Sequence, residues 1–145
     1  MDRLIILFSR PAILGQVKSR LARDIGHEKA LSVHQKLFDR TLGIVQESGY
    51  QHKIYLSAIP QPDFPHHFTL QQGNNLGDRM ARAFAQELSS WQQVVLIGSD
   101  CLDLMTVDLA TAFEQLEKHE LVLGPAADGG YYLIGLRRFI PDIFR

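Results

Sequence analysis

The sequence has very little cysteine, no surplus of either charge and no long apolar segment. Its single cysteine, Cys101, excludes a disulfide within the chain. Because 15 lysines and arginines face 16 aspartates and glutamates, no basic surplus drives sequence-independent binding to nucleic acid. No apolar run approaches the about 18 residues that a membrane span needs. We therefore expect neither a nucleic-acid partner nor a membrane span.

A secretory signal is also missing. Asp2 and Arg3 precede a short apolar run that meets Arg10 and Pro11, not a small-residue cleavage site. We therefore expect a cytoplasmic protein. The 145 residues, 46% of them hydrophobic, are enough for one well-packed core, so the sequence predicts a single domain over residues 1–145.

Strands and helices alternate along the chain. Continuous apolar runs at Leu4–Phe8 and Val94–Ile97 are typical of strands buried on both faces. Further strands are expected at 54–58, where apolar and polar residues alternate, and at 67–71, 121–123 and 131–136. A helix is expected from His27 to the residue before Gly49. This order predicts an α/β fold with a mainly parallel sheet.

Two more helices carry recognisable start signals. Asn75 is expected to cap a helix whose apolar stripe begins at Leu76. Thr106 is expected to cap the helix that follows Val94–Ile97. In open α/β sheets ligands bind outside the carboxyl ends of the strands, so the loops there are the places to search for a site.

The loop after the first strand, SRPAILGQVKSRLA, carries three cations. Arg10, Lys18 and Arg20 could hold phosphate groups, and Gly15 would let the backbone approach a ligand closely. A solvated basic loop explains the same residues equally well. The segment matches neither a P-loop nor a GxGxxG fingerprint, which argues against an ATPase and an NAD-dependent enzyme.

The loop after Val94–Ile97, GSDCLDL, places Asp100 where a strand end would present a carboxylate. Mg²⁺ or Mn²⁺ would suit it, because such ions take one or two protein carboxylates and complete their shell with water and phosphate oxygens. Asp103 could assist as a second ligand. Alternatively, Asp100 bonds to loop backbone and Asp103 lies near a helix start, where negative charge is favourable.

Two other segments are candidates for ligand contact. In GPAADGGYYLIGL, Gly129 and Gly130 beside Asp128 permit close approach of a ligand, although a tight turn between strands explains the same letters. QQGNNLGDRM leads into a helix N-terminus whose free amides, near Arg79, could receive polar ligand groups. Ser99 lies in no GxSxG elbow, so nucleophilic catalysis lacks support.

Four segments together, FSRPAILGQVKSRLA, QQGNNLGDRM, LIGSDCLDL and LGPAADGGYYLIGL, resemble in order one family of GT-A-like nucleotide-diphospho-sugar transferases. The resemblance implies an α/β three-layer sandwich around a mixed, mostly parallel sheet. It also implies a nucleotide cradled by the first loop and a divalent ion held after the central strand.

The resemblance extends to single positions. The family's Lys-Thr-Arg stretch falls on Lys18, Ser19 and Arg20. Its Gly-x-Asp-Cys-Pro stretch falls on residues 98–102, where Leu102 stands in place of the proline. Its Asp-Gly-Gly-Tyr stretch falls on residues 128–131. Gln72 and Gly73 match the stretch that lines the base pocket. Combined with the loop residues singled out above, this gives the candidate nucleotide-binding residues Arg10, Gly15, Lys18, Arg20, Gln72, Gly73, Arg79, Asp128, Gly129 and Gly130 and the candidate metal ligands Asp100, Asp103 and Asp128.

The implied function is a Mg²⁺- or Mn²⁺-dependent transferase that uses a nucleotide-sugar or a nucleoside triphosphate, with Lys18, Arg20 and Asp100 catalytic. One alternative is a non-catalytic nucleotide-binding module that acts with a partner. Another is an α/β scaffold whose acidic and basic loop residues only satisfy each other. The base, the sugar and the acceptor stay open, as does the choice between glycosyl and nucleotidyl transfer.

Family members continue past the position of Arg145 with a later acidic motif, so the sequence is expected to lack the family's C-terminal part. Its own end is strongly apolar, with Phe139, Ile140, Ile143 and Phe144 close together. Such residues gain stability from burial. We expect this end to pack against its own sheet or against a second copy of the chain.

Overall fold

The computed structural model describes residues 2–127 and 129–145 and forms three layers around one sheet. Six strands of the described chain lie in the order β3-β2-β1-β4-β6-β5. The strands are β1 (Arg3–Ser9), β2 (Gln51–Leu56), β3 (Thr69–Leu70), β4 (Gln93–Gly98), β5 (Leu121–Pro125) and β6 (Tyr131–Leu136). The helices are α1 (Ser19–Ile25), α2 (His27–Ser48), α3 (Leu76–Leu88) and α4 (Thr106–Leu116), with a short 3₁₀ helix, η1 (Pro141–Phe144).

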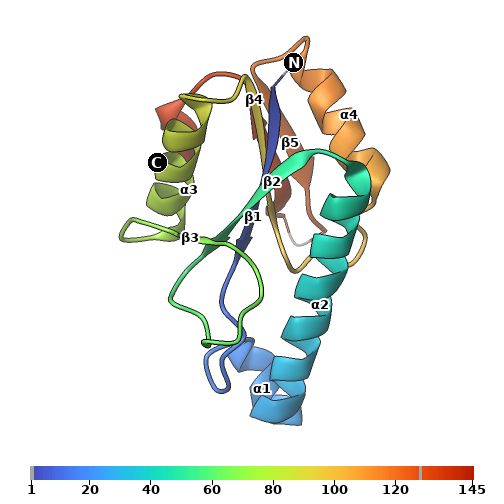
Figure 1. Cartoon of the computed structure of the whole chain (residues 1–145), viewed down its shortest axis with the longest axis vertical. Coiled ribbons are helices and arrows are strands. Elements are labelled where there is room, and N and C mark those ends of the chain that lie inside the picture. Colours follow the sequence, from blue (N-terminus) through green and yellow to red (C-terminus); the bar gives the residue numbers. More distant parts are fainter. Residues whose placement is uncertain (1, 128) are drawn as a thin grey trace.

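The central strand β1 shows why the sheet is covered on both faces. Ile5 and Leu7 point to one face and pack in a cluster with residues of α2 and α4. Leu4 and Ile6 point to the other face and pack with residues of α3 and η1. All four side chains are buried. Figure 1 shows α3 on one side of the sheet and α2 with α4 on the other, so the predicted α/β three-layer fold is confirmed.

The strand directions decide where the loops meet. β1 pairs in parallel with both β2 and β4, and β2 pairs in parallel with β3. β6 runs antiparallel to β4 and to β5, which makes the sheet mixed. The start of β6 therefore lies beside the carboxyl end of β4, where Ile97 is opposite Leu133. The segments that follow β1, β3, β4 and β5 all leave the sheet at this same edge.

Several expected element boundaries are wrong. β2 begins at Gln51 and ends at Leu56, so Ala58 lies outside it, and the strand expected at 67–71 is only Thr69–Leu70. The segment expected as one basic loop contains α1, which places Arg20 in a helix. Leu76, expected in the apolar stripe of α3, is 61% exposed because it stands in the first turn, beyond the sheet edge.

The N-cap of α4 is Met105, not Thr106, which is the first helical residue. Met105 has extended backbone, and its amide donates to the Asp108 carboxylate at 2.8 Å. The acidic residue at the third helical position supplies the side-chain bond in place of a hydroxyl cap. By contrast, the predicted cap at Asn75 is confirmed, because its Oδ1 accepts the Asp78 amide at 2.8 Å.

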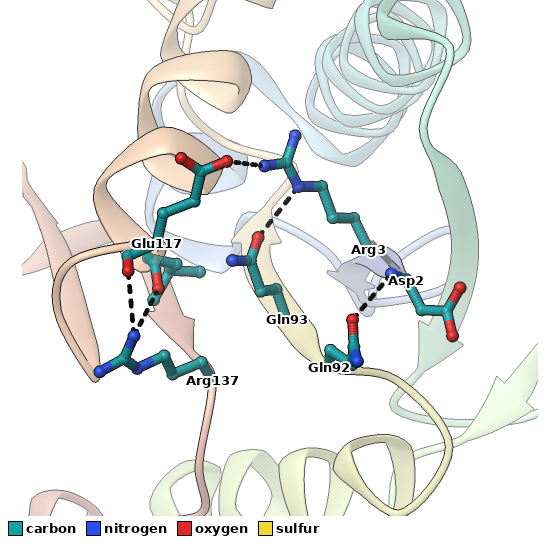
Figure 2. A network of polar contacts seen from close by, with 7 residues as sticks. Asp2, Arg3, Gln92, Gln93, Glu117 and Arg137 are labelled. Carbon is teal, nitrogen blue, oxygen red and sulfur yellow. Dashed lines mark hydrogen bonds and ion pairs between the residues drawn. The ribbon is translucent and has the colours of Figure 1, made fainter.

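A polar network joins β1, β4 and the end of α4 at the opposite edge of the sheet (Figure 2). Arg3 donates to Gln93 at 3.0 Å and forms an ion pair with Glu117 at 2.7 Å. Arg137 donates to the Glu117 carbonyl at 3.1 Å. Cations and donors at a helix C-terminus satisfy its last carbonyls, so these contacts hold α4 against the sheet.

The apolar C-terminal segment packs in part against its own chain, as expected. Ile140 and Phe144 pack on the α3 side of the sheet, and the ring centroids of Phe144 and Phe84 are 5.6 Å apart. Phe139 and Ile143 are each 37% exposed. Within the part of the chain that the structure describes, no helix has the length and apolarity to cross a membrane.

Replacing Phe144 with alanine should lower the free energy of unfolding by about 1 to 3 kcal/mol, through lost apolar burial and a lost aromatic contact. Urea denaturation measures the change. Ile143→Ala is the matched control, because Ile143 lies in the same 3₁₀ helix and is more than a third exposed. An equal loss in both variants would contradict a specific role for the Phe84–Phe144 contact.

Candidate functional site

The ends of β1 and β4 form the floor of the candidate site. The register places Phe8 beside Gly98, so the next residues, Ser9 and Ser99, are neighbours. Their hydroxyl oxygens are 3.1 Å apart, and both residues are buried. The chain order reverses here, since β2 lies on one side of β1 and β4 on the other. This is the switch point at which open α/β sheets bind ligands.

Lys18 and Asp100 come together above this floor. Lys18 follows β1, Asp100 follows β4, and the Lys18 Nζ is 2.9 Å from the Asp100 Oδ1. The Lys18 side chain is only 18% exposed, whereas that of Asp100 is 74% exposed. Two residues predicted to be catalytic therefore meet, and the carboxylate keeps most of its surface open to solvent.

Lys18 holds this position in an unusual backbone conformation. Its φ of 48° and ψ of 51° are left-handed, and it is the one non-glycine residue with positive φ in the described part of the chain. Such a conformation costs about 1 to 3 kcal/mol and persists only where surrounding contacts impose it. Lys18 also precedes the first residue of α1, so the left-handed turn sends the chain into that helix.

A hollow of about 230 Å³ lies at the loop after β1, and two further predicted residues line it. Arg10 and Arg79 line it, together with Gln16. Ser57 and Ala58, which directly follow β2, complete the lining. Arg10 comes from the β1 loop and Arg79 from the first turns of α3. The structure thus brings together cations that are 69 positions apart in the sequence, as the ligand-binding prediction requires.

Gly73 requires its lack of a side chain. A Cβ atom there would be 2.7 Å from the Asp78 carboxylate, and its φ of 138° disfavours other residues. The Gly73 carbonyl accepts a hydrogen bond from the Arg79 Nε at 3.1 Å, which orients that guanidinium. Gln72, the other residue expected at the base pocket, is exposed. Its role stays a prediction.

The amides at the start of α3 are less free than the sequence suggested. Asn75 accepts the Asp78 amide, and the Asp78 carboxylate accepts the Asn74 amide at 3.2 Å. The helix brings its own carboxylate to its positive end, which already neutralises part of the helix dipole. The expectation of free amides there is therefore wrong for these two groups. The Arg79 side chain is the part of this segment that faces the hollow.

Residues 126–130 connect antiparallel β5 and β6, and the tight-turn interpretation of this segment is confirmed. The Ala126 amide donates to the Gly130 carbonyl at 2.7 Å, and Gly129 has a φ of 92°. The turn lies at the same sheet edge as Asp100. The predicted ligand roles of Gly129 and Gly130 stay predictions, and Asp128 lies outside the described residues.

The carboxylates of the β4 loop fit a divalent ion in a limited way. Among residues 2–127 and 129–145, no group of three or more His, Cys, Asp and Glu side chains is placed to hold a metal. Asp103 is exposed, and Asp100 presents oxygen ligands of the kind Mg²⁺ and Mn²⁺ prefer. The described residues therefore suit an ion that takes most of its ligands from phosphates and water.

The sequence alone does not identify two side chains of α2 that hold the loops after β1 and β4 through hydrogen bonds. His34 of α2 is buried, and its Nε2 donates to the Arg10 carbonyl at 2.9 Å, since a carbonyl can only accept. Thr41 of the same helix donates to the Ser99 carbonyl at 3.4 Å. The spacing of seven residues places His34 and Thr41 on one helix face, which is the signal that could have found them.

Burial lowers the pKa of His34 below 6.5, and the nearby cations of Lys18 and Arg10 lower it further. The hydrogen bond to the Arg10 carbonyl and the charge of Asp100 act in the opposite direction. The folded protein thus keeps a neutral imidazole under the loop.

Larger hollows lie elsewhere. One of about 430 Å³ lies beside the network of Figure 2, where Glu117 and Arg137 are already bonded within the protein. Another, of about 490 Å³, lies between α3 and the C-terminal residues. Size therefore does not identify the site. The smaller hollow combines predicted phosphate-binding cations with the segments that follow β1 and β2.

The described geometry agrees with the comparisons with known proteins. Residues 61–145, more than half of the chain, match a family described as "Uncharacterized protein conserved in bacteria (DUF2064)". The chain belongs to this family. No curated protein matches it.

One solved structure similar to this DUF2064 chain is a "putative nucleotide-diphospho-sugar transferase" from Desulfovibrio desulfuricans. The two sequences are 32% identical over 99% of this chain and 68% of that one, and the TM-score is 0.90. The resemblance to GT-A-like nucleotide-diphospho-sugar transferases is therefore confirmed for the family and the fold.

The stability of the protein should depend on pH through His34. Because its pKa is lowered on folding, protonation favours the unfolded chain, so its contribution is present above pH 6.5 and is lost as the pH falls below that value. His34→Gln keeps a donor for the Arg10 carbonyl and removes the titration. Urea denaturation at neutral pH and at about pH 5 should show a larger loss in the parent than in His34→Gln. The same pH dependence in both proteins would exclude His34 as the cause.

Proposed function

We propose that this DUF2064 chain is a divalent-metal-dependent transferase that binds a nucleoside diphosphate or triphosphate donor, such as a nucleotide-sugar. Two observations support the proposal: the Lys18–Asp100 pair after β1 and β4, and the hollow lined by Arg10 and Arg79 beside the segments that follow β1 and β2. Cations and one exposed carboxylate are the groups that a metal-bound diphosphate needs. The name of the Desulfovibrio structure supports a transferase of this kind.

The proposed roles follow from where each side chain lies. Arg10 and Arg79 line the hollow and would hold phosphate oxygens or the nucleoside. Lys18, together with Arg20 of α1, would neutralise charge that develops on the diphosphate as its bond to the transferred group breaks. Gln72 and Gly73 would lie along the base. No side-chain nucleophile is needed, because the acceptor supplies the attacking group.

Asp100 would hold the Mg²⁺ or Mn²⁺ ion, with Asp103 and Asp128 as further candidate ligands. When bound, such an ion supplies Lewis-acid stabilisation of the charge on the leaving diphosphate. The exposure of the Asp100 carboxylate leaves room for the phosphate oxygens and water that would complete the shell. Glycosyl and nucleotidyl transfer share this arrangement and differ in which atom the acceptor attacks.

The direct test is a thermal-shift panel of nucleosides, nucleoside diphosphates and nucleotide-sugars, with and without Mn²⁺. A ligand that binds only the folded protein raises the midpoint of unfolding. We expect diphosphates, but not nucleosides, to give shifts that grow with Mn²⁺. If no nucleotide shifts the midpoint under any condition, the proposal fails.

Asp100→Ala should abolish the Mn²⁺-dependent part of nucleotide binding and leave the fold intact, because the side chain is 74% exposed. Calorimetric titration of a nucleoside diphosphate with and without Mn²⁺ measures this. Asp63→Ala, another exposed carboxylate in the segment after β2, is the control. If Mn²⁺ strengthens binding equally in Asp100→Ala and the parent, Asp100 is not the ligand.

Lys18→Gln and Arg20→Gln should weaken diphosphates far more than the corresponding nucleoside. A lost charge-assisted hydrogen bond costs about 1.5 to 3 kcal/mol, which corresponds to roughly 10- to 100-fold in affinity. Arg23→Gln, an exposed cation of the same helix α1, should change little. Equal weakening of nucleoside and diphosphate would instead indicate a folding defect.

The second candidate is a nucleotide-binding module without catalysis. It is favoured by the Lys18–Asp100 ion pair, because the carboxylate that would hold a metal already has a cationic partner. Such a module would bind a diphosphate and release it unchanged. A turnover assay that follows release of the nucleotide product, run on the panel's best ligand, distinguishes the two.

A further inference from the structure

The Lys18–Asp100 ion pair has a consequence for the order in which ligands bind. We propose that Lys18 occupies the place of the divalent ion in the ligand-free protein, so that the site takes a metal and a diphosphate together and rejects the metal alone. This inference rests on the proposed function, because it assumes that Asp100 is the metal ligand. It deepens that function by naming the substrate as the metal complex of a diphosphate.

The geometry of the pair supports this exchange. The Lys18 Nζ is 2.9 Å from an Asp100 oxygen, within the distance of a charge-assisted hydrogen bond. A second cation at that oxygen would stand next to the ammonium group, and like charges so close repel. The Lys18 side chain is only 18% exposed, so water screens its ammonium group in part, whereas the Asp100 side chain is 74% exposed and is screened more strongly. The repulsion therefore weakens metal binding at Asp100 until Lys18 moves away.

The surroundings supply a reason for Lys18 to move. Arg10, which lies in the same segment between β1 and α1 as Lys18, lines a hollow together with Arg79, and these two cations attract a diphosphate toward the β1 loop. Once there, phosphate oxygens offer the Lys18 ammonium a new partner, while the same phosphates offer the metal the ligands that Asp100 alone cannot supply. Lys18 then leaves the Asp100 carboxylate and pairs with a phosphate group. The freed carboxylate binds the metal.

Lys18 stands at the turn that leads into α1. Its left-handed conformation is uncommon for lysine and is imposed where the ion pair forms. The side chain reaches Asp100 from the turn between the β1 loop and α1, so a rotation of the side chain alone redirects the ammonium group. No larger movement of the fold is required.

Exchange of this kind makes the two ligands cooperative. Each ligand removes the obstacle to the other, and such coupling is reciprocal by thermodynamic linkage. In the parent protein, Mn²⁺ alone or inorganic pyrophosphate alone should raise the midpoint of thermal unfolding only slightly. Both together should raise it by more than the sum of the separate shifts.

The test uses Mn²⁺ alone, followed by the electron paramagnetic resonance signal of the free ion. Lys18→Gln should bind Mn²⁺ about five-fold or more tightly than the parent, because the competing cation is gone. Lys18→Gly, which tolerates the left-handed backbone, should behave in the same way and guards against a variant that fails to fold. Arg23→Gln removes a charge of the same sign from α1 without touching Asp100 and should leave the affinity unchanged. The gain should vanish in the double variant Lys18→Gln/Asp100→Asn.

The proposal is overturned if Lys18→Gln binds Mn²⁺ no better than the parent, if Arg23→Gln gains as much, or if the gain survives Asp100→Asn. In the first case, loss of Mn²⁺ binding in Asp100→Asn would still support Asp100 as the ligand in the proposed function. If no variant binds Mn²⁺, the exchange is excluded, and the nucleotide panel alone decides the proposed function.

Discussion

The pairing of β1 with β2 on one side and β4 on the other is the constraint on which the rest of the molecule depends. β1 contributes buried residues to the apolar clusters on both faces, so helices must cover both sides of the sheet. Because all three strands run in one direction, their carboxyl ends share one edge. The segments that contain the candidate binding residues all lie at that edge. At the opposite edge, the polar network around Arg3 holds β1, β4 and α4 together.

The sequence predicts the elements whose signal is local. β1 and β4 are continuous apolar runs, α2 ends at a left-handed Gly49, and α3 begins at the Asn75 cap. α1 was missed because its seven residues carry no apolar stripe long enough to show a helical period. The antiparallel direction of β6 was indicated only by the tight-turn interpretation of the segment before it and by the mixed sheet that the resemblance implies, because the letters of a buried strand do not encode the direction of its neighbours.

The candidate site was predicted as separate loops, and the structure supplies the relations between them. The sequence assigns Lys18 to a phosphate group and Asp100 to a metal ion separately. In the folded chain the two residues, 82 positions apart in the sequence, form an ion pair. Single-sequence patterns cannot show such a pair, since the two loops meet only through the register of β1 and β4. The support by His34 was hidden for the same reason, because a buried histidine on a helix resembles any other core position until its carbonyl partner is known.

The chain's only thiol lies directly beside Asp100. Cys101 is half-buried, packs against the cluster that contains Ile5 and Leu7, and its carbonyl lies 3.5 Å from an Arg40 donor atom. A thiol-directed reagent can therefore modify only this position, and its partial burial ties the rate of modification to local opening of the β4 loop. The natural sequence thus contains a built-in chemical reporter at the centre of the proposed site, with no engineered cysteine required.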